Sequence, residues 1–260
     1  MTNTDYVTSI INRIKNQGRS ISNIYSGDAI KQVVNYWENR GVVVIAIADQ
    51  GFVRLFYVYN TKSDFQNLLT ELPNGNYCLE IMTKNVTENQ DVMEKAGFSS
   101  IAALKRMSVK NCGPYLEDEH TSAFLDSSIG LYPGMEEAEE INSILWSVFD
   151  HRISHLLDDS GMAEAIKNQE ITIHRNESGQ IDAILHVHVQ PKKFYINQVF
   201  NRGDKKVIHA MLQNRLKPYV EQGGKYVYAW IEKNNIASLK FHSKYGLAHD
   251  GMWNMVYYKG

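Results

Sequence analysis

The segment from Tyr226 to Tyr258 constrains the fold more than any other part of the 260-residue chain. Its first residues, YVYAWIE, alternate side chains between two faces, as a buried strand does. Asn234-Asn235 then favours the start of a helix, and Gly246 favours its end. Residues 252–258 favour a second strand that runs back. The segment therefore predicts a strand, a helix and a second strand, a combination typical of mixed α/β domains.

The same segment carries a spaced pattern of an asparagine, a small residue, an aromatic pair, a glycine and a large apolar residue. These are Asn235, Ser238, Phe241, His242, Gly246 and Leu247. The pattern resembles the carboxyl-terminal signature of the GNAT superfamily of acyl-CoA-dependent N-acyltransferases. The resemblance implies a mixed α+β fold, with a mostly antiparallel central sheet flanked by helices, and acetyl-CoA as the co-substrate.

His242 is the position at which the chain departs from that pattern, because the superfamily usually carries Tyr there. A histidine can hold a transferable proton near neutral pH, so we predict His242 as the general acid that protonates the leaving thiolate. The alternative is a half-exposed helix residue without a catalytic role.

A second departure lies in the segment that the resemblance assigns to the pyrophosphate of acyl-CoA. There, backbone amides at a strand end and at the start of the next helix would bind the phosphates. This chain keeps one glycine and adds three cations. The predicted cofactor-binding residues are Val199, Phe200, Arg202, Gly203, Asp204, Lys205 and Lys206, together with Asn235 and Ser238. The alternative is an exposed basic turn that binds no ligand.

The amine acceptor must lose a proton, so a base is expected near the central strands. Glu232, at a strand end, is the catalytic candidate, although such a residue is usually solvated. His186 and His188 share one face of a predicted strand, and His151 and His155 lie in the run between two predicted helices; these four are acceptor-site candidates. The alternative for His151 and His155 is a structural role, because residues four apart can simply share one helical face. Two histidines make only half a metal site, so no metal is predicted.

The two halves of the chain repeat a similar order of elements. Residues 95–98, KAGF, match residues 244–247, KYGL, and each tetrapeptide follows a predicted helix and precedes a predicted strand. Met93 stands where His242 stands in the second half. We predict a degenerate GNAT-like domain at residues 1–115, a linker at 116–133 and an acetyltransferase domain at 134–260.

Two local expectations bear on this comparison. Residues 29–40 show helical spacing and residues 42–59 a hairpin. Because Tyr59 leads within a few residues into a short helix before Pro73, the first half has no expected counterpart for the strand and long helix at 194–217. Pro218 should end or kink that helix. Only the second half would then keep the ligand-binding part.

Composition narrows the functional classes. A net charge of −2 and a pI near 6.5 argue against general binding of nucleic acid or anionic membranes. Two cysteines and an amino terminus without a long apolar run favour a cytoplasmic protein, as a monomer or homodimer.

Together these features predict an N-acetyltransferase that transfers the acetyl group of acetyl-CoA to a primary amine of a small molecule or peptide. Two alternatives remain open. One is a non-catalytic GNAT-like binding or scaffold protein. The other is a Fem-type aminoacyl transferase, which the neutral charge balance disfavours because such enzymes take their acyl group from charged transfer RNA.

Overall fold

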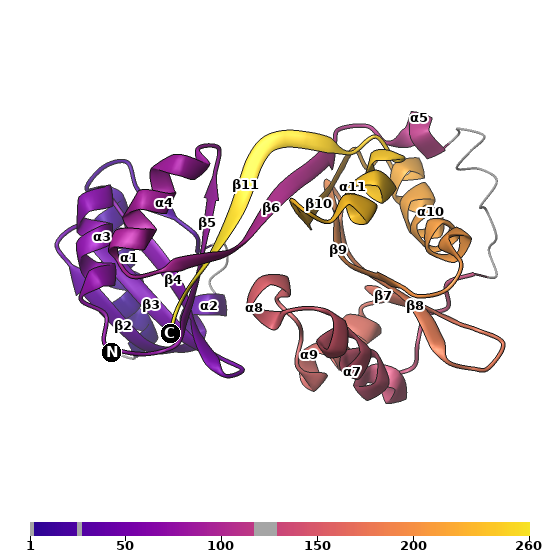
Figure 1. Ribbon diagram of the computed structural model, residues 1–260, viewed down its shortest axis with the longest axis horizontal. Coiled ribbons are helices and arrows are strands. Elements are labelled where there is room, and N and C mark those ends of the chain that lie inside the picture. The colour runs from indigo at the N-terminus through magenta and orange to yellow at the C-terminus, as the bar shows by residue number, and fades with distance from the viewer. Residues whose placement is uncertain (1–2, 25–27, 117–128) are drawn as a thin grey trace. The chain divides into compact units, whose positions relative to one another are not determined.

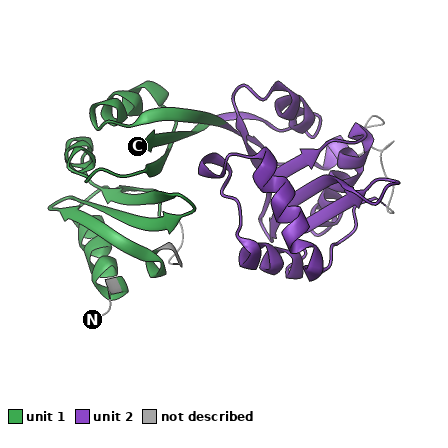
Figure 2. Cartoon of the chain, turned by 60° about the horizontal axis from the view of Figure 1, so that its bottom comes forward, with its two compact units in different colours: residues 1–104, 252–260 green, residues 105–251 purple. Residues whose placement is uncertain are grey.

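The computed structural model describes residues 3–24, 28–116 and 129–260. These residues divide into two compact units, shown in Figure 2: unit 1 comprises residues 1–104 and 252–260, and unit 2 comprises residues 105–251. Two strands contribute residues to both units: β6 (Ser99–Val109) and β11 (Ala248–Lys259).

Unit 1 is a mixed sheet with the strand order β2-β3-β4-β5-β11-β6. The strands β2, β3 and β4 form an antiparallel meander, and β4 is parallel to β5 through the crossover helix α3. Besides β6 and β11, its elements are α1 (Asn3–Asn16), β1 (Ile21–Ser22), α2 (Asp28–Lys31), β2 (Val33–Asn39), β3 (Val42–Asp49), β4 (Phe52–Tyr59), α3 (Lys62–Thr70), β5 (Tyr77–Thr83) and α4 (Val86–Lys95).

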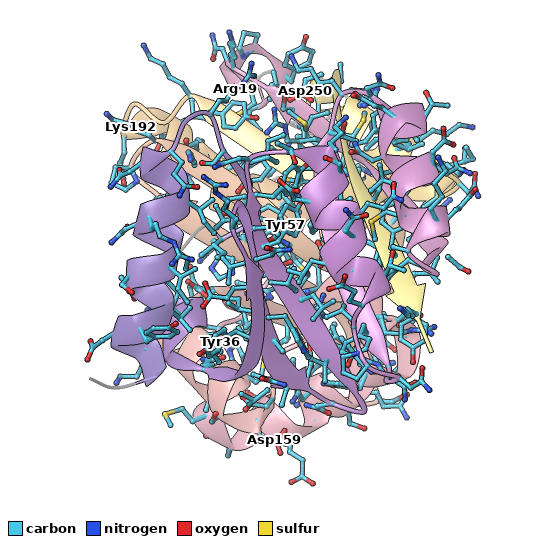
Figure 3. The ribbon with its side chains drawn as sticks, turned by 90° about the vertical axis from the view of Figure 1, so that its left-hand side faces the viewer. Arg19, Tyr36, Tyr57, Asp159, Lys192 and Asp250 are labelled. Carbon is cyan, nitrogen blue, oxygen red and sulfur yellow. The ribbon has the colours of Figure 1, made fainter. Side chains whose placement is uncertain are left out.

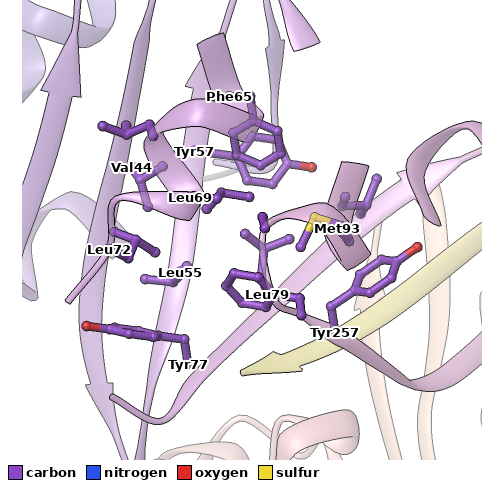
Figure 4. Packing of buried hydrophobic residues seen from close by; sticks show 14 of the residues in the cluster. Val44, Leu55, Tyr57, Phe65, Leu69, Leu72, Tyr77, Leu79, Met93 and Tyr257 are labelled. Carbon is purple, nitrogen blue, oxygen red and sulfur yellow. The ribbon is translucent and has the colours of Figure 1, made fainter. Parts of the chain in front are cut away.

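The alternation of apolar residues along β3 explains why helices cover both faces of this sheet. Val44 packs with α3 and α4 in the cluster that also holds Leu55, Tyr57, Phe65, Leu69 and Tyr257, several of which are labelled in Figure 4. Tyr57, also labelled in Figure 3, lies against Phe65 of α3, with ring centroids 4.6 Å apart. Val43 and Ile45 point the opposite way and pack with α1.

Unit 2 repeats this plan with the strand order β7-β8-β9-β10-β6. The strands β7, β8 and β9 form an antiparallel meander, and β9 is parallel to β10 through α10. Besides its parts of β6 and β11, the elements are α5 (Gly113–Leu116), η1 (Met135–Glu137), α7 (Ala138–Val148), α8 (His151–Ser154), α9 (Asp159–Lys167), β7 (Ile171–Arg175), β8 (Ile181–Gln190), β9 (Lys193–Asn201), α10 (Lys205–Glu221), β10 (Tyr226–Glu232) and α11 (Ile236–Ser243).

Helices again cover both faces of the sheet of unit 2. The helix α10 packs on one face through Ile208, Met211 and Leu212, and α7 and α9 pack on the other (Figure 1). The predicted fold class, a mixed α/β structure with a mostly antiparallel sheet flanked by helices, is confirmed. Within the described ranges, no helix is both long and apolar enough to cross a membrane.

The predicted helix at residues 29–40 is wrong. Only Asp28–Lys31 is helical, and Val33–Asn39 forms β2, paired with β3. Tyr36 packs on the α1 side of the sheet and Trp37 on the α3 side, so successive residues alternate between faces. With β2 in place, β4-α3-β5 is the counterpart of β9-α10-β10. Unit 1 therefore has the strand and crossover helix that the sequence comparison assigned to the second half alone.

Pro218 does not end α10, which continues through it to Glu221, so that one of the two expected outcomes, the end of the helix, is wrong. A proline inside a helix removes one backbone hydrogen bond. Tyr219 compensates by packing into the core, where its hydroxyl donates to the carbonyl of Tyr226. This anchor holds the last turn of the helix.

The repeated tetrapeptides form matching turns. Gly97 and Gly246 both adopt positive φ, +82° and +76°. After each, a backbone N–H reaches back five residues, from Phe98 to the carbonyl of Met93 and from Leu247 to that of His242. Such left-handed helix ends favour glycine, which explains why glycine recurs at both sites.

The division into units differs from the predicted boundary. Most of the predicted linker at 116–133 lies outside the described residues, and the chain passes from unit 1 to unit 2 within β6 and returns within β11. A prediction from local composition places boundaries in loops, whereas here the boundary falls inside two strands.

Candidate active site in unit 2

The parallel strands β9 and β10 pair over only part of their length. The register joins Lys193–Ile196 to Tyr226–Ala229, after which β9 continues to Asn201. Against β8, Gln198 lies opposite His186 and Ile196 lies opposite Val187, which leaves Asn197 as an extra residue. Such a bulge bends a strand. The bulge therefore coincides with the point where β9 separates from β10.

Packing on the two sides of the bulge supports the same geometry. Ile196 packs with α10 on one face of the sheet, whereas Phe200 packs with α7 and α9 on the other. Residues four apart in a regular strand would share a face. From Gln198 onward, the edge of β9 that faces away from β8 can therefore accept hydrogen bonds from an extended ligand lying between the separated strands.

The equivalent separation in unit 1 is filled by the chain itself. The strands β4 and β5 pair from Val53/Tyr77 to Leu55/Leu79. Beyond that point the buried Asn23 donates from Nδ2 to the carbonyls of Leu55 and Glu80, at 3.4 and 3.3 Å, and accepts the N–H of Tyr57 at 2.7 Å. One side chain thus bridges both strands, so we place the ligand site in unit 2.

The predicted cofactor loop follows the separated end of β9. At Gly203 an added Cβ would lie 2.3 Å from Oδ2 of Asp182, so a side chain there would require Asp182 to move. Asp182 is itself held by His174, whose Nδ1 lies 2.6 Å from Oδ1. The loop therefore approaches β8 closely at the one glycine it retains.

The charged residues of this loop have different roles. The guanidinium of Arg202 donates to the carbonyl of Ile181 at 2.6 Å and lies over the ring of Phe200. The carboxylate of Asp204 caps α10 by accepting the N–H of Lys206 at 2.9 Å. Arg202 and Asp204 thus stabilise the loop, while Lys205 and Lys206 are exposed in the first turn of α10, where the helix dipole also favours anions.

Asn235 and Ser238 lie at the start of α11. The Oδ1 atom of Asn235 accepts the N–H of Ser238 at 3.0 Å, so this asparagine is a helix cap. Ser238 also contacts the next turn, where its Oγ lies 3.3 Å from Nδ1 of His242. Both residues therefore have structural partners, and their predicted role in cofactor binding stays a prediction.

His242 is buried, with 2% of its surface exposed, rather than half exposed. Its Nδ1 lies 2.8 Å from the carbonyl of Ser238, which makes Nδ1 the protonated nitrogen, and Nε2 has no hydrogen-bond partner. Burial lowers the pKa of His242 to about 4, and the bond to Ser238 only partly opposes this. At neutral pH the ring is neutral, and its one proton is directed at its own helix.

The other predicted site residues lie at separate places in unit 2. Glu232 is exposed at the end of β10. His151 stacks on Trp146, with ring centroids 5.0 Å apart, and His155 ends α8 with φ +46°. The end of α8 is tied to the bulged strand, because Nε2 of Gln198 donates to the carbonyl of Ser154 at 2.8 Å. The loop that carries His155 therefore borders the bulge.

His186 and His188 are brought together with a residue that the sequence did not reveal, Glu170. Nδ1 of His188 lies 2.9 Å from Oε1 of Glu170, and Nε2 of His186 lies 3.8 Å from Oε2. Burial alone would raise the pKa of the Glu170 carboxyl, but the two histidines outweigh it and the net shift is downward. Gln198 is a second residue that the sequence did not reveal, and its Oε1 lies 2.5 Å from Nδ1 of His186. The alternation His-x-His was visible in the sequence, but the approach of Glu170 from the preceding turn was not.

Comparisons with known proteins match this architecture at the level of fold. No family model matches the chain, and no curated protein matches it. A GNAT-family acetyltransferase structure from Colwellia psychrerythraea is 13% identical, with a TM-score of 0.56, covering 99% of this chain and 97% of that one. A GCN5-related N-acetyltransferase from Sphaerobacter thermophilus is 14% identical, with a TM-score of 0.55 and coverages of 84% and 76%. A tandem GNAT protein from the clavulanic acid biosynthesis pathway is 9% identical, with a TM-score of 0.51 and coverages of 84% and 78%. The chain therefore has the GNAT fold, as the resemblance implied.

Proposed function

We propose that unit 2 is an acyl-CoA-dependent N-acyltransferase that transfers an acetyl group from acetyl-CoA to a primary amine of a small molecule or peptide. The observation that carries this proposal is the separation of β9 and β10 at the Asn197 bulge, followed directly by the Gly203 loop and the start of α10. An extended thioester would lie along the edge of β9, and its phosphates would lie at the start of α10 near Lys205 and Lys206. The fold shared with solved GNAT acetyltransferases supports the same assignment.

The reaction is a direct transfer. The amine nitrogen attacks the thioester carbonyl, a C–N bond forms, the C–S bond breaks, and the thiolate of CoA leaves. The amine must lose one proton and the thiolate gains one. Holding the two reactants together supplies much of the acceleration.

His242 is a poor source of that proton. Its Nε2 carries no proton at neutral pH, and its Nδ1 proton is directed at Ser238. A thiol with a pKa of about 8.5 leaves readily as the thiolate, so the transfer does not require a protein acid. We therefore assign the rate to positioning and propose that solvent protonates the thiolate.

Calorimetric titration with acetyl-CoA tests the proposal. A Lys205→Ala/Lys206→Ala variant removes the two exposed cations beside the proposed phosphates, and we expect its affinity to fall about tenfold or more. The matched control is Lys192→Ala/Lys193→Ala, which removes two exposed lysines at the opposite end of β9. Equal affinity in both variants would contradict the phosphate assignment, and no saturable binding at about 1 mM acetyl-CoA would contradict the cofactor assignment.

A second candidate function is ligand binding without catalysis. The neutral, buried His242 and the Asp204 carboxylate at the start of α10 favour it, because the first supplies no proton and the second repels phosphate. Release of CoA thiol in the presence of a panel of primary amines separates the two functions. Saturable acetyl-CoA binding without thiol release from any amine would favour the binding protein.

A further inference from the structure

Three electron-rich side-chain atoms converge at the edge of unit 2. Glu170, His186 and His188 each offer one ligand atom, and these three atoms lie within 4.8 Å of one another. Among the described residues, this is the one group of three histidine, cysteine or acidic side chains whose ligand atoms lie close enough together to hold a metal ion. From it we propose that Glu170, His186 and His188 form a binding site for a divalent transition metal ion of the zinc class.

The backbone fixes Glu170 between the two histidines. The carbonyl of Glu170 accepts the N–H of Val187, the residue between His186 and His188 on β8, at 2.9 Å. Gln169, directly before Glu170, adopts a left-handed conformation with φ +56° at the end of α9. This conformation is uncommon for residues other than glycine, and it directs the chain so that Glu170 lies against β8.

Gln198 determines which nitrogen of His186 faces the cluster. Nε2 of Gln198 donates to the carbonyl of Ser154 at 2.8 Å, so the amide oxygen must be the atom that faces Nδ1 of His186. The 2.5 Å contact to this oxygen assigns the proton to Nδ1, and the side-chain amide of Asn197 lies farther from the same nitrogen, at 3.2 Å. A metal-binding histidine typically donates its second ring N–H to an oxygen acceptor in this way.

The consequence lies at Nε2 of His186. That atom carries a lone pair, is buried in a residue with 1% of its surface exposed, has no hydrogen-bond partner and faces the Glu170 carboxylate at 3.8 Å. A buried lone pair and a carboxylate oxygen repel one another unless a proton or a metal ion lies between them. A bound metal ion would satisfy both atoms.

The spacing and donor types fit zinc. Two ligands about 2.0–2.1 Å from a tetrahedral zinc ion lie about 3.3 Å apart. The carboxylate of Glu170 lies 2.9 Å from Nδ1 of His188 through Oε1 and 3.8 Å from Nε2 of His186 through Oε2, so these two distances bracket that value. Two imidazoles and one carboxylate suit zinc better than calcium or magnesium, which prefer oxygen alone. The side chain of His188 is 40% exposed, so water can supply a fourth ligand.

Titration of chelator-treated full-length protein with Zn²⁺, followed by calorimetry, tests the site directly. We expect one tight site per chain, at least tenfold weaker in Glu170→Gln and in His188→Gln, which replace a ligand by a neutral side chain of similar size. His249→Ala removes an exposed histidine on β11 and should bind as the wild type does. Circular dichroism of each variant confirms that it is folded.

A spectroscopic arm separates a built site from adventitious binding. Co²⁺ in place of Zn²⁺ should give visible d–d absorption bands that disappear in Glu170→Gln. Gln198→Leu, which removes the acceptor for Nδ1 of His186, should weaken Zn²⁺ binding about tenfold while leaving all three ligands in place. Absence of saturable Zn²⁺ binding, or equal affinity in the wild type and in the ligand variants, would overturn the proposal. The test does not depend on acetyl transfer.

Discussion

His242 shows how one residue can satisfy a sequence pattern and still have another role. It lies at the same position in its turn as Met93 does in unit 1, and both side chains are buried. A core position taken by methionine in one repeat and by histidine in the other is explained by packing alone. The sequence placed His242 on the correct helix, but its burial depends on the sheet beneath it, which local spacing does not report.

The substitution His242→Met should stabilise the protein. It removes a buried Nε2 without a partner, whose burial costs about 1–3 kcal/mol, and supplies the side chain that unit 1 uses. We expect the free energy of unfolding in urea to rise by about 1 kcal/mol, with acetyl transfer unchanged. A large loss of acetyl-transfer turnover in a stably folded His242→Met protein would instead show that His242 acts as the general acid.

The buried histidines also make stability depend on pH. The folded-state pKa of His242, about 4, lies below the unfolded value of about 6.5, so the stability it contributes is present above pH 6.5 and is lost as the pH falls towards 4. Between pH 7 and pH 5 we expect a loss of about 2 kcal/mol from this residue. His209, whose pKa burial and the Lys244 charge also lower, acts in the same direction.

Urea denaturation at both pH values measures this loss. The His242→Met variant provides the control, because its loss between pH 7 and pH 5 should be smaller by about 2 kcal/mol. An identical pH dependence in the variant would show that His242 is not protonated on unfolding in this range.

At the scale of elements, strands and helices could be predicted where the apolar residues fit only one hydrophobic periodicity. They could not be predicted where the apolar residues fit both the helical and the strand periodicity. Residues 29–40 have apolar side chains at positions that fit either a helix or an alternating strand. Pairing with β3 decides in favour of the strand, and that pairing is a tertiary contact. Likewise, His-x-His on β8 was visible, but Glu170 reaches it only through the turn after α9.

The Gly203 loop gives a prediction at this scale. In Gly203→Ala the new Cβ would overlap Oδ2 of Asp182, and Asp182 cannot yield easily because His174 holds it. We expect a loss of about 1–3 kcal/mol in the free energy of unfolding and weaker acetyl-CoA binding, because the loop must move.

The double variant Asp182→Ala/Gly203→Ala tests the cause. Compared with Asp182→Ala alone, adding the alanine at position 203 should cost little, since the clashing carboxylate is gone. If Gly203→Ala destabilises equally in both backgrounds, overlap with Asp182 is not the reason for the glycine.

At the scale of the whole molecule, the two repeats differ in what fills their separated strands. Asn23 bridges β4 and β5 in unit 1, so we expect one acetyl-CoA per chain by calorimetry. Asn23→Ala removes three hydrogen bonds to backbone groups, of which only the Glu80 carbonyl keeps a second side-chain donor, the Tyr57 hydroxyl. The substitution should lower the free energy of unfolding by about 2–3 kcal/mol, with the stoichiometry still one. Asn35→Ala, at an exposed site on β2, should change stability little. Two acetyl-CoA molecules per wild-type chain would contradict this assignment.

The passage of β11 between the units makes unit 1 depend on the carboxyl terminus. Trp253–Lys259 pair with the whole of β5, and Met255 and Tyr257 are buried in the core of unit 1. Each buried large side chain contributes about 1.5–3 kcal/mol, and the lost strand pairing adds to this, against a total of about 5–15 kcal/mol for a typical domain. A fragment of residues 1–104 should therefore be unfolded, whereas the same fragment fused through a flexible linker to residues 248–260 should unfold cooperatively in urea. A cooperative transition in the unfused fragment would show that unit 1 is a domain that residues 1–104 specify alone, with β11 an accessory strand rather than part of its core.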